Sequence, residues 1–268
     1  MGVDGWLIRR RVRTRWPSTF ALAAVVALTS LIAFISIGTA QRTRDAYPDF
    51  LSRSRVGDLV INPSLVSTGI DRAIRDLPGV EAVTTDALLL DTSTKPSFAG
   101  DATGLDNFLQ IRGSTDGRFE AMDRPAISAG RLPTGASEAF VSASVAKAGG
   151  LHLGDPLELT FGNARDDVDV LSDGNITLAG SATVRVVGIG TLPDEVLPDG
   201  LFPRARILVS PDVVRRFTCP LVDVPAGAAL QQIVDLVLPK GCARSFQFYS
   251  LRLRDGSAEV VGCTERAT

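Results

Sequence analysis

Residues 57–90 read GDLVINPSLVSTGIDRAIRDLPGVEAVTTDALLL and carry the clearest succession of secondary-structure signals in the chain. Residues 57–62 alternate between polar and apolar side chains, as a half-buried strand does. Residues 67–77 then repeat apolar side chains at helical spacing, and the Pro-Gly pair that follows ends this helix. Strand character resumes over residues 80–90. The stretch therefore predicts a compact β-α-β unit.

Downstream of this unit, the sequence alternates short runs of Val, Ile and Leu with turn residues after a polar connection over residues 91–106. Such runs are typical of strands, and longer amphipathic stretches between them indicate helices. Strands are expected at 108–112, 157–161, 183–189, 206–209 and 246–253, a strand that becomes a short helix at 139–147, and helices at 211–217 and 228–238. This order predicts an α+β fold with mainly antiparallel pairing.

Upstream of the unit, no charged residue occurs between Trp16 and Gln41, and residues 20–38 are almost entirely apolar or small. A helix of about 20 such residues spans the hydrocarbon core of a bilayer, which is roughly 30 Å thick. We therefore expect residues 17–40 to form one transmembrane helix. The chain from residue 41 onward would then lie on the other side of the membrane from the N-terminus.

The charges that flank this helix predict its orientation. The basic residues before it are Arg9, Arg10, Arg11, Arg13 and Arg15. Beyond the helix, Arg42 and Arg44 are offset by Asp45 and Asp49. Because arginine and lysine concentrate on the cytoplasmic side, residues 1–16 should form a cytoplasmic basic amphipathic segment. The expected localisation is the cell membrane, single-pass, with an extracytoplasmic main domain.

A cleaved signal peptide is the alternative, because Gly38, Thr39 and Ala40 form a site of small residues behind a basic segment. The apolar run is longer than the roughly 7 to 15 residues usual for a signal peptide, which favours an uncleaved anchor. Both interpretations export the domain.

Composition narrows the classes of protein. The chain of 268 residues has a net charge of -2 and 45% hydrophobic residues, enough to fill a sizeable core. Positive charge gathers in the first fifteen residues and acidic residues lie mostly beyond residue 40. This distribution argues against nucleic acid as a partner.

Several sequence blocks, in this order and at this spacing, resemble the FtsX-like permease family, specifically the MacB-like periplasmic core domain of actinobacterial ABC transporter permeases. The blocks are RTRDAYPDFL at 42–51, LPGVEAV at 77–83, Gly130, Arg131 and Pro133, Glu138 to Val141, Ala146, Gly154 with Asp155, VRVVGI at 184–189 and RILVS at 206–210. No single block is specific, so the resemblance depends on their order after one apolar helix.

The resemblance implies a first membrane helix, a split outer domain, three further membrane helices and a cytoplasmic ABC ATPase as partner. Only about a dozen residues follow Gly256, which departs from that plan. Residues 41–262 are therefore expected to form an extracytoplasmic core domain that is incomplete at its C-terminal end, with apolar sheet surface left uncovered, and residues 263–268 a tail. The chain is not expected to transport alone, and the resemblance implies no cofactor.

Candidate catalytic or metal-binding residues are weak. His152 has no second histidine or cysteine nearby to complete a metal site. Ser144 to Lys147 matches the S-x-x-K pattern of serine penicillin-binding enzymes, but the companion motifs of those enzymes are missing. Four aspartates precede Asn175 without the spacing of a calcium-binding EF-hand: Asp166, Asp167, Asp169 and Asp173. We therefore predict no catalytic, cofactor or metal site, and no enzyme.

Three cysteines, Cys219, Cys242 and Cys263, lie in the last fifty residues, in a part of the chain expected to be in an oxidising compartment. Cys219 and Cys242 flank the helix expected at 228–238, so we predict a disulfide between them. Closing a loop of that size contributes on the order of 3 kcal/mol.

Two functions remain open. The first is the N-terminal portion of an FtsX/MacB-like ABC transporter permease, with an extracytoplasmic domain for substrate handling or motion transmission. The expected partners are the lipid bilayer, a cytoplasmic ABC ATPase subunit and the remaining permease helices. The second is a stand-alone, membrane-anchored binding or adaptor module.

Overall fold

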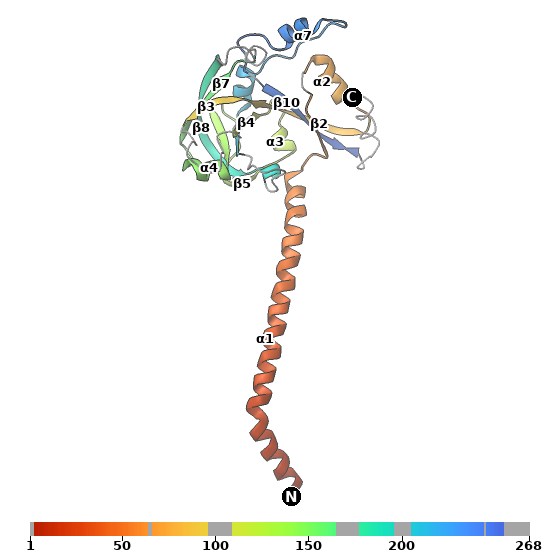
Figure 1. Ribbon diagram of the computed structural model, residues 1–268, viewed down its shortest axis with the longest axis vertical. Coiled ribbons are helices and arrows are strands. Elements are labelled where there is room, and N and C mark those ends of the chain that lie inside the picture. The colour runs from red at the N-terminus through yellow and green to blue at the C-terminus, as the bar shows by residue number, and fades with distance from the viewer. Residues whose placement is uncertain are drawn as a thin grey trace. The chain divides into compact units, whose positions relative to one another are not determined.

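The computed structural model describes residues 3–63, 66–95, 109–164, 177–195, 205–243 and 245–254. The chain divides into two compact units, Met1–Ser52 and Arg53–Thr268, and each is considered by itself. The second unit holds the sheet and all the sites described below (Figure 1).

The first unit, Met1–Ser52, holds all but the last two residues of helix α1, Val3–Ser54. Along its apolar stretch the side chains are exposed on every side; Phe20 is 65% and Phe34 76% exposed. The hydroxyls of Thr29 and Ser36 donate to carbonyl oxygens one turn back, at 3.0 and 2.8 Å. Among the described residues, no helix combines the length and apolarity that a membrane crossing needs. The transmembrane helix at 17–40 stays a prediction.

The β-α-β unit expected at 57–90 consists of β1 (Leu59–Ile61), α2 (Thr68–Arg75) and β2 (Val80–Leu89). Helix α2 begins where the Ser67 hydroxyl accepts from the backbone N–H of Ile70 at 3.3 Å, a typical N-cap. The two strands are not neighbours. Strand β10, Ser245–Leu253, lies between them and is antiparallel to both, so the unit is split by the last strand of the sheet.

The remaining elements complete one mixed sheet, and most of them coincide with the sequence expectations. Their bounds are β3 Asp91–Lys95, β4 Leu109–Gly113, α3 Arg118–Ala121, β5 Ala126–Gly130, β6 Glu138–Ser142, α4 Ala143–Gly149, β7 Pro156–Gly162, β8 Leu178–Thr191, η2 Pro193–Glu195, β9 Ala205–Val209, α6 Pro211–Phe217 and α7 Leu230–Val237. The strand order is β1-β10-β2-β4-β9-β6-β8-β7-β3, with β5 paired to β8.

Antiparallel pairing dominates, as the sequence predicts. Among the described strands, only β4 with β9 and β6 with β8 pair in parallel. The polar connection expected over 91–106 begins with a strand instead, β3, which pairs with β7. Strand β5 and the short helices α3 and η2 were not anticipated, because each is too short to show a period.

The core of the second unit lies where α4 and α6 pack on the middle of the sheet. Its fully buried side chains include Leu89, Ile111, Leu157, Phe161 and Ile207. A smaller cluster forms where Ile74 of α2 packs on Tyr249 and Leu251 of β10. Helix α2 is therefore held against β10 by the same apolar face that its sequence period predicts.

The described part of the second unit begins and ends at the same edge of the sheet. The backbone N–H of Asp58, just before β1, donates to the carbonyl of Leu251 at 2.8 Å. The Asp58 carboxylate accepts from the N–H of Leu253 at 2.8 Å, and the Arg252 guanidinium donates to the carbonyl of Arg55 at 3.1 Å. Arg55 to Asp58 and the end of β10 therefore form one bonded corner.

Candidate functional site

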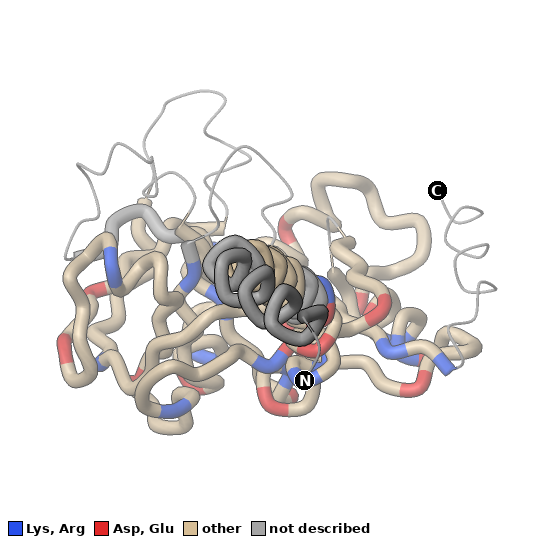
Figure 2. Tube along the Cα trace, turned by 90° about the horizontal axis from the view of Figure 1, so that it is seen from below, with Lys and Arg blue, Asp and Glu red and all other residues tan. Residues whose placement is uncertain are grey.

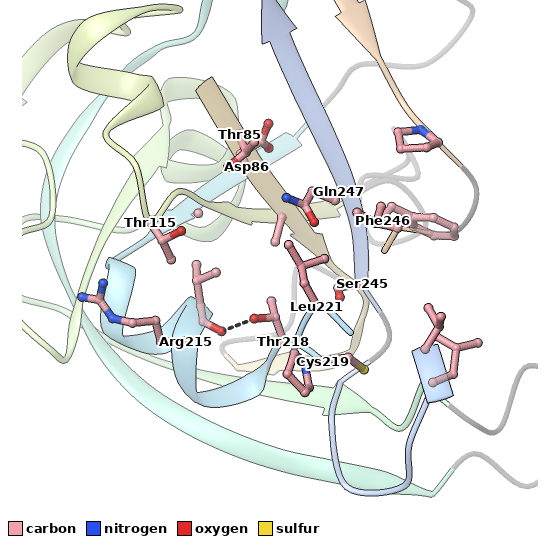
Figure 3. A pocket seen from close by; sticks show the side chains of 18 residues that line it. Thr85, Asp86, Thr115, Arg215, Thr218, Cys219, Leu221, Ser245, Phe246 and Gln247 are labelled. Atoms are coloured by element: carbon pink, nitrogen blue, oxygen red, sulfur yellow. Dashed lines mark hydrogen bonds between the residues drawn. The ribbon is translucent and has the colours of Figure 1, made fainter. Parts of the chain in front are cut away.

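The best-defined cavity of the described residues encloses about 420 Å³ beside β10 (Figure 3). Strands β2, β4 and β10 form its floor, the segment after β1 one side, and α6, the segment after it and the end of α7 the rest. Volumes of about 300 to 1,000 Å³ are usual for sites that bind small molecules.

The alternation of side chains along β2 and β10 determines which residues form the floor of the cavity. Successive side chains of a strand point to opposite faces of the sheet. Ser245, Gln247 and Tyr249 therefore share one face of β10, and Thr85 and Ala87 lie on the same face of β2 through the pairs Gln247–Ala87 and Tyr249–Thr85. The floor of the cavity is small and uncharged.

The wall opposite β10 is the segment Cys219–Leu221, which is fixed at both ends. At one end the structure joins Cys219 to Cys242 by a disulfide, with Cα atoms 5.0 Å apart. At the other end the carbonyl of Val222 accepts from the N–H of Thr68 at 3.1 Å. These are the two cysteines that the sequence analysis pairs. Because the disulfide fixes one end of the segment, it shapes this side of the cavity.

Two charged residues line the described part of the cavity: Asp86 of β2, which alternates with Thr85 and so points its carboxylate to the opposite face of the sheet, and Arg215 at the rim. Arg215 of α6 donates to Asp212 at 2.9 Å, and both side chains are more than half exposed. Asp116 accepts from the Thr85 N–H and hydroxyl at 2.9 to 3.0 Å, so its carboxylate is already engaged at the edge of the floor.

Further hydrogen bonds join β10 to α2 on the same face of the sheet as Thr85. The Tyr249 hydroxyl donates to Asp71 of α2 at 3.0 Å, and Arg75 donates to Asp71 at 3.1 Å. Burial and the neighbouring Asp71 carboxylate raise the pKa of Tyr249 above its usual range. The phenol is therefore neutral, and this network fixes α2 on β10.

The opposite face of the same strands carries a buried cluster of charges. Asp86 of β2 is fully buried and accepts from Arg112 of β4 and from Arg118 of α3. Arg118 also donates to Asp123 at 2.7 Å, and the Arg112 guanidinium lies 4.9 Å from the centre of the Phe248 ring. We call Asp86, Arg112, Arg118 and Asp123 the Asp86 cluster.

The Asp86 cluster is extended by Arg206 of β9, which pairs with Asp194 of η2. Burial lowers the pKa of Arg206, and the nearby positive charges of Arg112 and Arg118 lower it further. Next to Asp194, burial raises the pKa of Glu195 to about 7. Within the described part of the chain, three buried polar atoms here have no hydrogen-bond partner: Asp194 Oδ1, Glu195 Oε1 and Arg206 Nε.

Chemically, the Asp86 cluster resembles a structural ion-pair network more than a reaction centre. Each carboxylate is opposed by a guanidinium, and among the described residues no group of three or more His, Cys, Asp or Glu side chains is arranged to hold a metal ion. Guanidinium groups stay protonated and make poor bases. The cavity, with its uncharged floor, is the better candidate for binding.

The residues weighed in the sequence lie outside both places. His152 is exposed, 83% for its side chain, with Nδ1 3.7 Å from the Asp155 carboxylate. The Ser144 hydroxyl lies 2.9 Å from that of Ser142, at the start of α4. The four aspartates of the acidic loop, Asn175 and Cys263 fall outside the described residues, as do the side chains of Arg9, Arg10, Arg11, Arg13 and Arg15.

The sequence analysis missed Gln247, Asp86 and Arg112. A usable signal existed for the two charged residues, since Arg112 is the one charge of β4 and Asp86 stands between uncharged residues in the second half of β2. No local sequence pattern distinguishes Gln247, because what its main chain faces depends on where the neighbouring strand β1 ends. Figure 2 shows basic and acidic residues interspersed along the globular unit.

No family model matches the chain, and no curated protein matches it. Among solved structures, it is similar to a domain of a candidate permease protein from Porphyromonas gingivalis, with 18% identity and a TM-score of 0.39 over 80% of this chain and 85% of that chain. This similarity is too low to identify the protein.

Proposed function

We propose that the chain is the N-terminal portion of an FtsX/MacB-like ABC transporter permease, whose globular unit is an extracytoplasmic domain for substrate handling or motion transmission. The bonded corner between Arg55–Asp58 and the end of β10 carries this proposal. A domain inserted between two membrane segments must receive and release the chain at one place. The antiparallel pairing of β1 with β10 meets that requirement.

Helix α1 supports the membrane part of the proposal. Its exposed apolar side chains from Phe20 to Ile35 surround the helix, and an all-round apolar helix needs an apolar environment. The hydroxyls of Thr29 and Ser36 bond within the helix, which removes the cost of placing them in lipid. The sequence blocks shared with the permease family and the arginines before the helix supply the rest.

The orientation is tested by reporter fusions to the full-length chain. Alkaline phosphatase joined after Arg254 should be active, and green fluorescent protein joined there should be dark. The opposite pattern would refute an extracytoplasmic domain. A mature N-terminus at Gln41 in the mass spectrum of the exported protein would replace the anchor by a signal peptide.

The permease assignment is tested by the neighbouring genes. A gene for an ABC ATPase, together with sequence for three further membrane helices, would support it. Neighbouring genes that encode neither would favour the stand-alone binding or adaptor module.

A further inference from the structure

Strand β10 has an open edge inside the cavity. It pairs with β2 along its whole length, from Ser245 to Leu253. On its other side β1 pairs only with Tyr249 to Leu251, because β1 ends at Ile61. Among the described residues, the first half of β10 therefore has a strand neighbour on one side only, and Ser245 and Gln247 line the cavity there.

The hydrogen-bond pattern identifies which main-chain groups face this open side. The N–H of Thr85 donates to Asp116, beyond the end of β4, so Thr85 faces away from β10. In an antiparallel ladder the facing side alternates from residue to residue. Asp86 therefore faces β10, its partner Phe248 faces β2, and Gln247 turns its N–H and C=O to the open side.

Two bonds at the other end of β10 give the same assignment independently. The Leu251 carbonyl accepts from Asp58 and the Leu253 N–H donates to Asp58, both on the β1 side, so odd-numbered residues of β10 face that side. Continuing the register of β1 past Ile61 places Pro63 opposite Gln247. Proline has no N–H to donate to the Gln247 carbonyl. Among the described residues, no backbone bond joins Pro63 to the Gln247 N–H either, so both groups of Gln247 stay open on this side.

An open strand edge is a template for another extended chain. Here the open edge of β10 faces the disulfide-linked segment Cys219–Leu221 across the cavity, and we call the space between them the slot. Figure 3 shows Leu221, Ser245 and Gln247 around this space. Its apolar lining consists of Pro63, Val66, Val214, Pro220, Leu221, Val237, Leu238 and Phe246.

We propose that this cavity binds a short extended peptide, which pairs with the main chain of Gln247 and places one uncharged apolar side chain between Val66, Leu221 and Leu238. Main-chain pairing supplies affinity in this mode, and the side-chain pocket supplies selectivity. A charged side chain is disfavoured, because Arg215, the one cation among the described residues that line the cavity, is already paired with Asp212, and the Asp86 carboxylate is bonded to arginines on the opposite face. The site stands on the geometry of β10 and does not require that the chain transports anything.

The test uses the full-length chain in detergent micelles and a fluorescein-labelled blocked tripeptide, acetyl-Val-Leu-Val-amide. Saturable binding is expected by fluorescence polarisation. A peptide with N-methyl groups on its central amides should bind at least about fivefold more weakly, the effect of one hydrogen bond of about 1 kcal/mol. Equal binding of both peptides, or no saturable binding, would overturn the proposal.

Two variants of Gln247 separate main-chain from side-chain recognition. Gln247→Val keeps the outward N–H and should keep binding, whereas Gln247→Pro removes this N–H and should lose at least about fivefold in affinity. Proline is tolerated in strands where the N–H points away from the ladder, so pairing with β2 should survive. Equal loss in both variants would assign recognition to the amide side chain and refute main-chain pairing.

A second pair of variants does not touch β10. Leu221→Asp places a charge in the wall of the slot and should abolish binding, while Leu153→Asp, at a similarly exposed leucine outside the cavity, should leave it unchanged; their exposures are 40% and 47%. Binding that survives Leu221→Asp would place the peptide elsewhere. Full displacement of the peptide by octanoate would assign the cavity to an acyl chain instead. If the chain binds the peptide but no ATPase gene neighbours its own gene, the permease proposal is refuted and the peptide site is supported.

Discussion

Replacing Asp86 by asparagine should destabilise the globular unit by about 3 kcal/mol. Its carboxylate is fully buried and accepts from Arg112 and Arg118, with the second Arg112 bond at 2.9 Å. Removing one partner of a buried ion pair costs about 3 to 5 kcal/mol, because it leaves an uncompensated buried charge. The lower end applies here, since Arg118 keeps Asp123 at 2.7 Å and Arg112 keeps Asp194 at 3.6 Å.

For a domain of this size each kcal/mol shifts the melting temperature by about 2 to 4 °C, so Asp86→Asn should lower it by about 6 to 12 °C. Scanning calorimetry of the full-length chain in detergent measures the shift. Asp212→Asn removes the same group from the exposed pair with Arg215 and should cost less than about 1 kcal/mol. Equal shifts for the two variants would refute the reasoning.

Three further predictions concern stability. Burial raises the pKa of Glu195 to about 7 from 4.5, so folding favours its protonated form. The free energy of unfolding should therefore fall by about 3 kcal/mol as pH rises from about 5 to 8. Denaturant titrations at each pH measure this slope, which Glu195→Gln should remove. Gly190→Ala places a methyl group against the carbonyl of Ala126 and the ring of Phe140 and should cost about 1 to 3 kcal/mol by the same measurement. Gly69→Ala in α2 brings its methyl group only to 3.7 Å from the Ser67 hydroxyl, an ordinary contact, and should cost nothing. Cys219→Ser should lower stability by about 3 kcal/mol under oxidising conditions only, and non-reducing peptide mapping that finds free thiols in the wild-type chain would contradict this.

The local signals of the sequence were sufficient for the first β-α-β elements and for most later strands, because their periods are expressed within ten residues. They could not show that β10 enters between β1 and β2. That pairing joins Leu59 to Leu251 across most of the chain, and nothing in either segment specifies its partner. The lengths of β1 and β10 differ as well, and the open edge at Gln247 follows only from that difference.

The Asp86 cluster could have been anticipated further than it was. Strands β4 and β9 each contain one charged residue, Arg112 and Arg206, and the stretch 82–89 of β2 contains one as well, Asp86, since Glu81 lies at the exposed start of that strand. Charges are rarely buried without a partner, so one acid and two bases in three buried strands predict that the strands are close in space. The order β2-β4-β9 agrees with that logic. The partners on α3 and η2 lie in short turns and give no such signal.

Strand β10 links the two places that matter for the proposed function. Its first residues form the open edge in the cavity, and its last residues are bonded to Arg55–Asp58 where the chain enters the unit. Between them it is hydrogen-bonded to β2 throughout, and at about 3.3 Å per residue it spans roughly 26 Å. A peptide on Gln247 would therefore extend the same ladder that ends at the corner formed with Arg55–Asp58. Peptide binding and the bonds of that corner would act on one continuous strand, as the proposed coupling of substrate to motion requires.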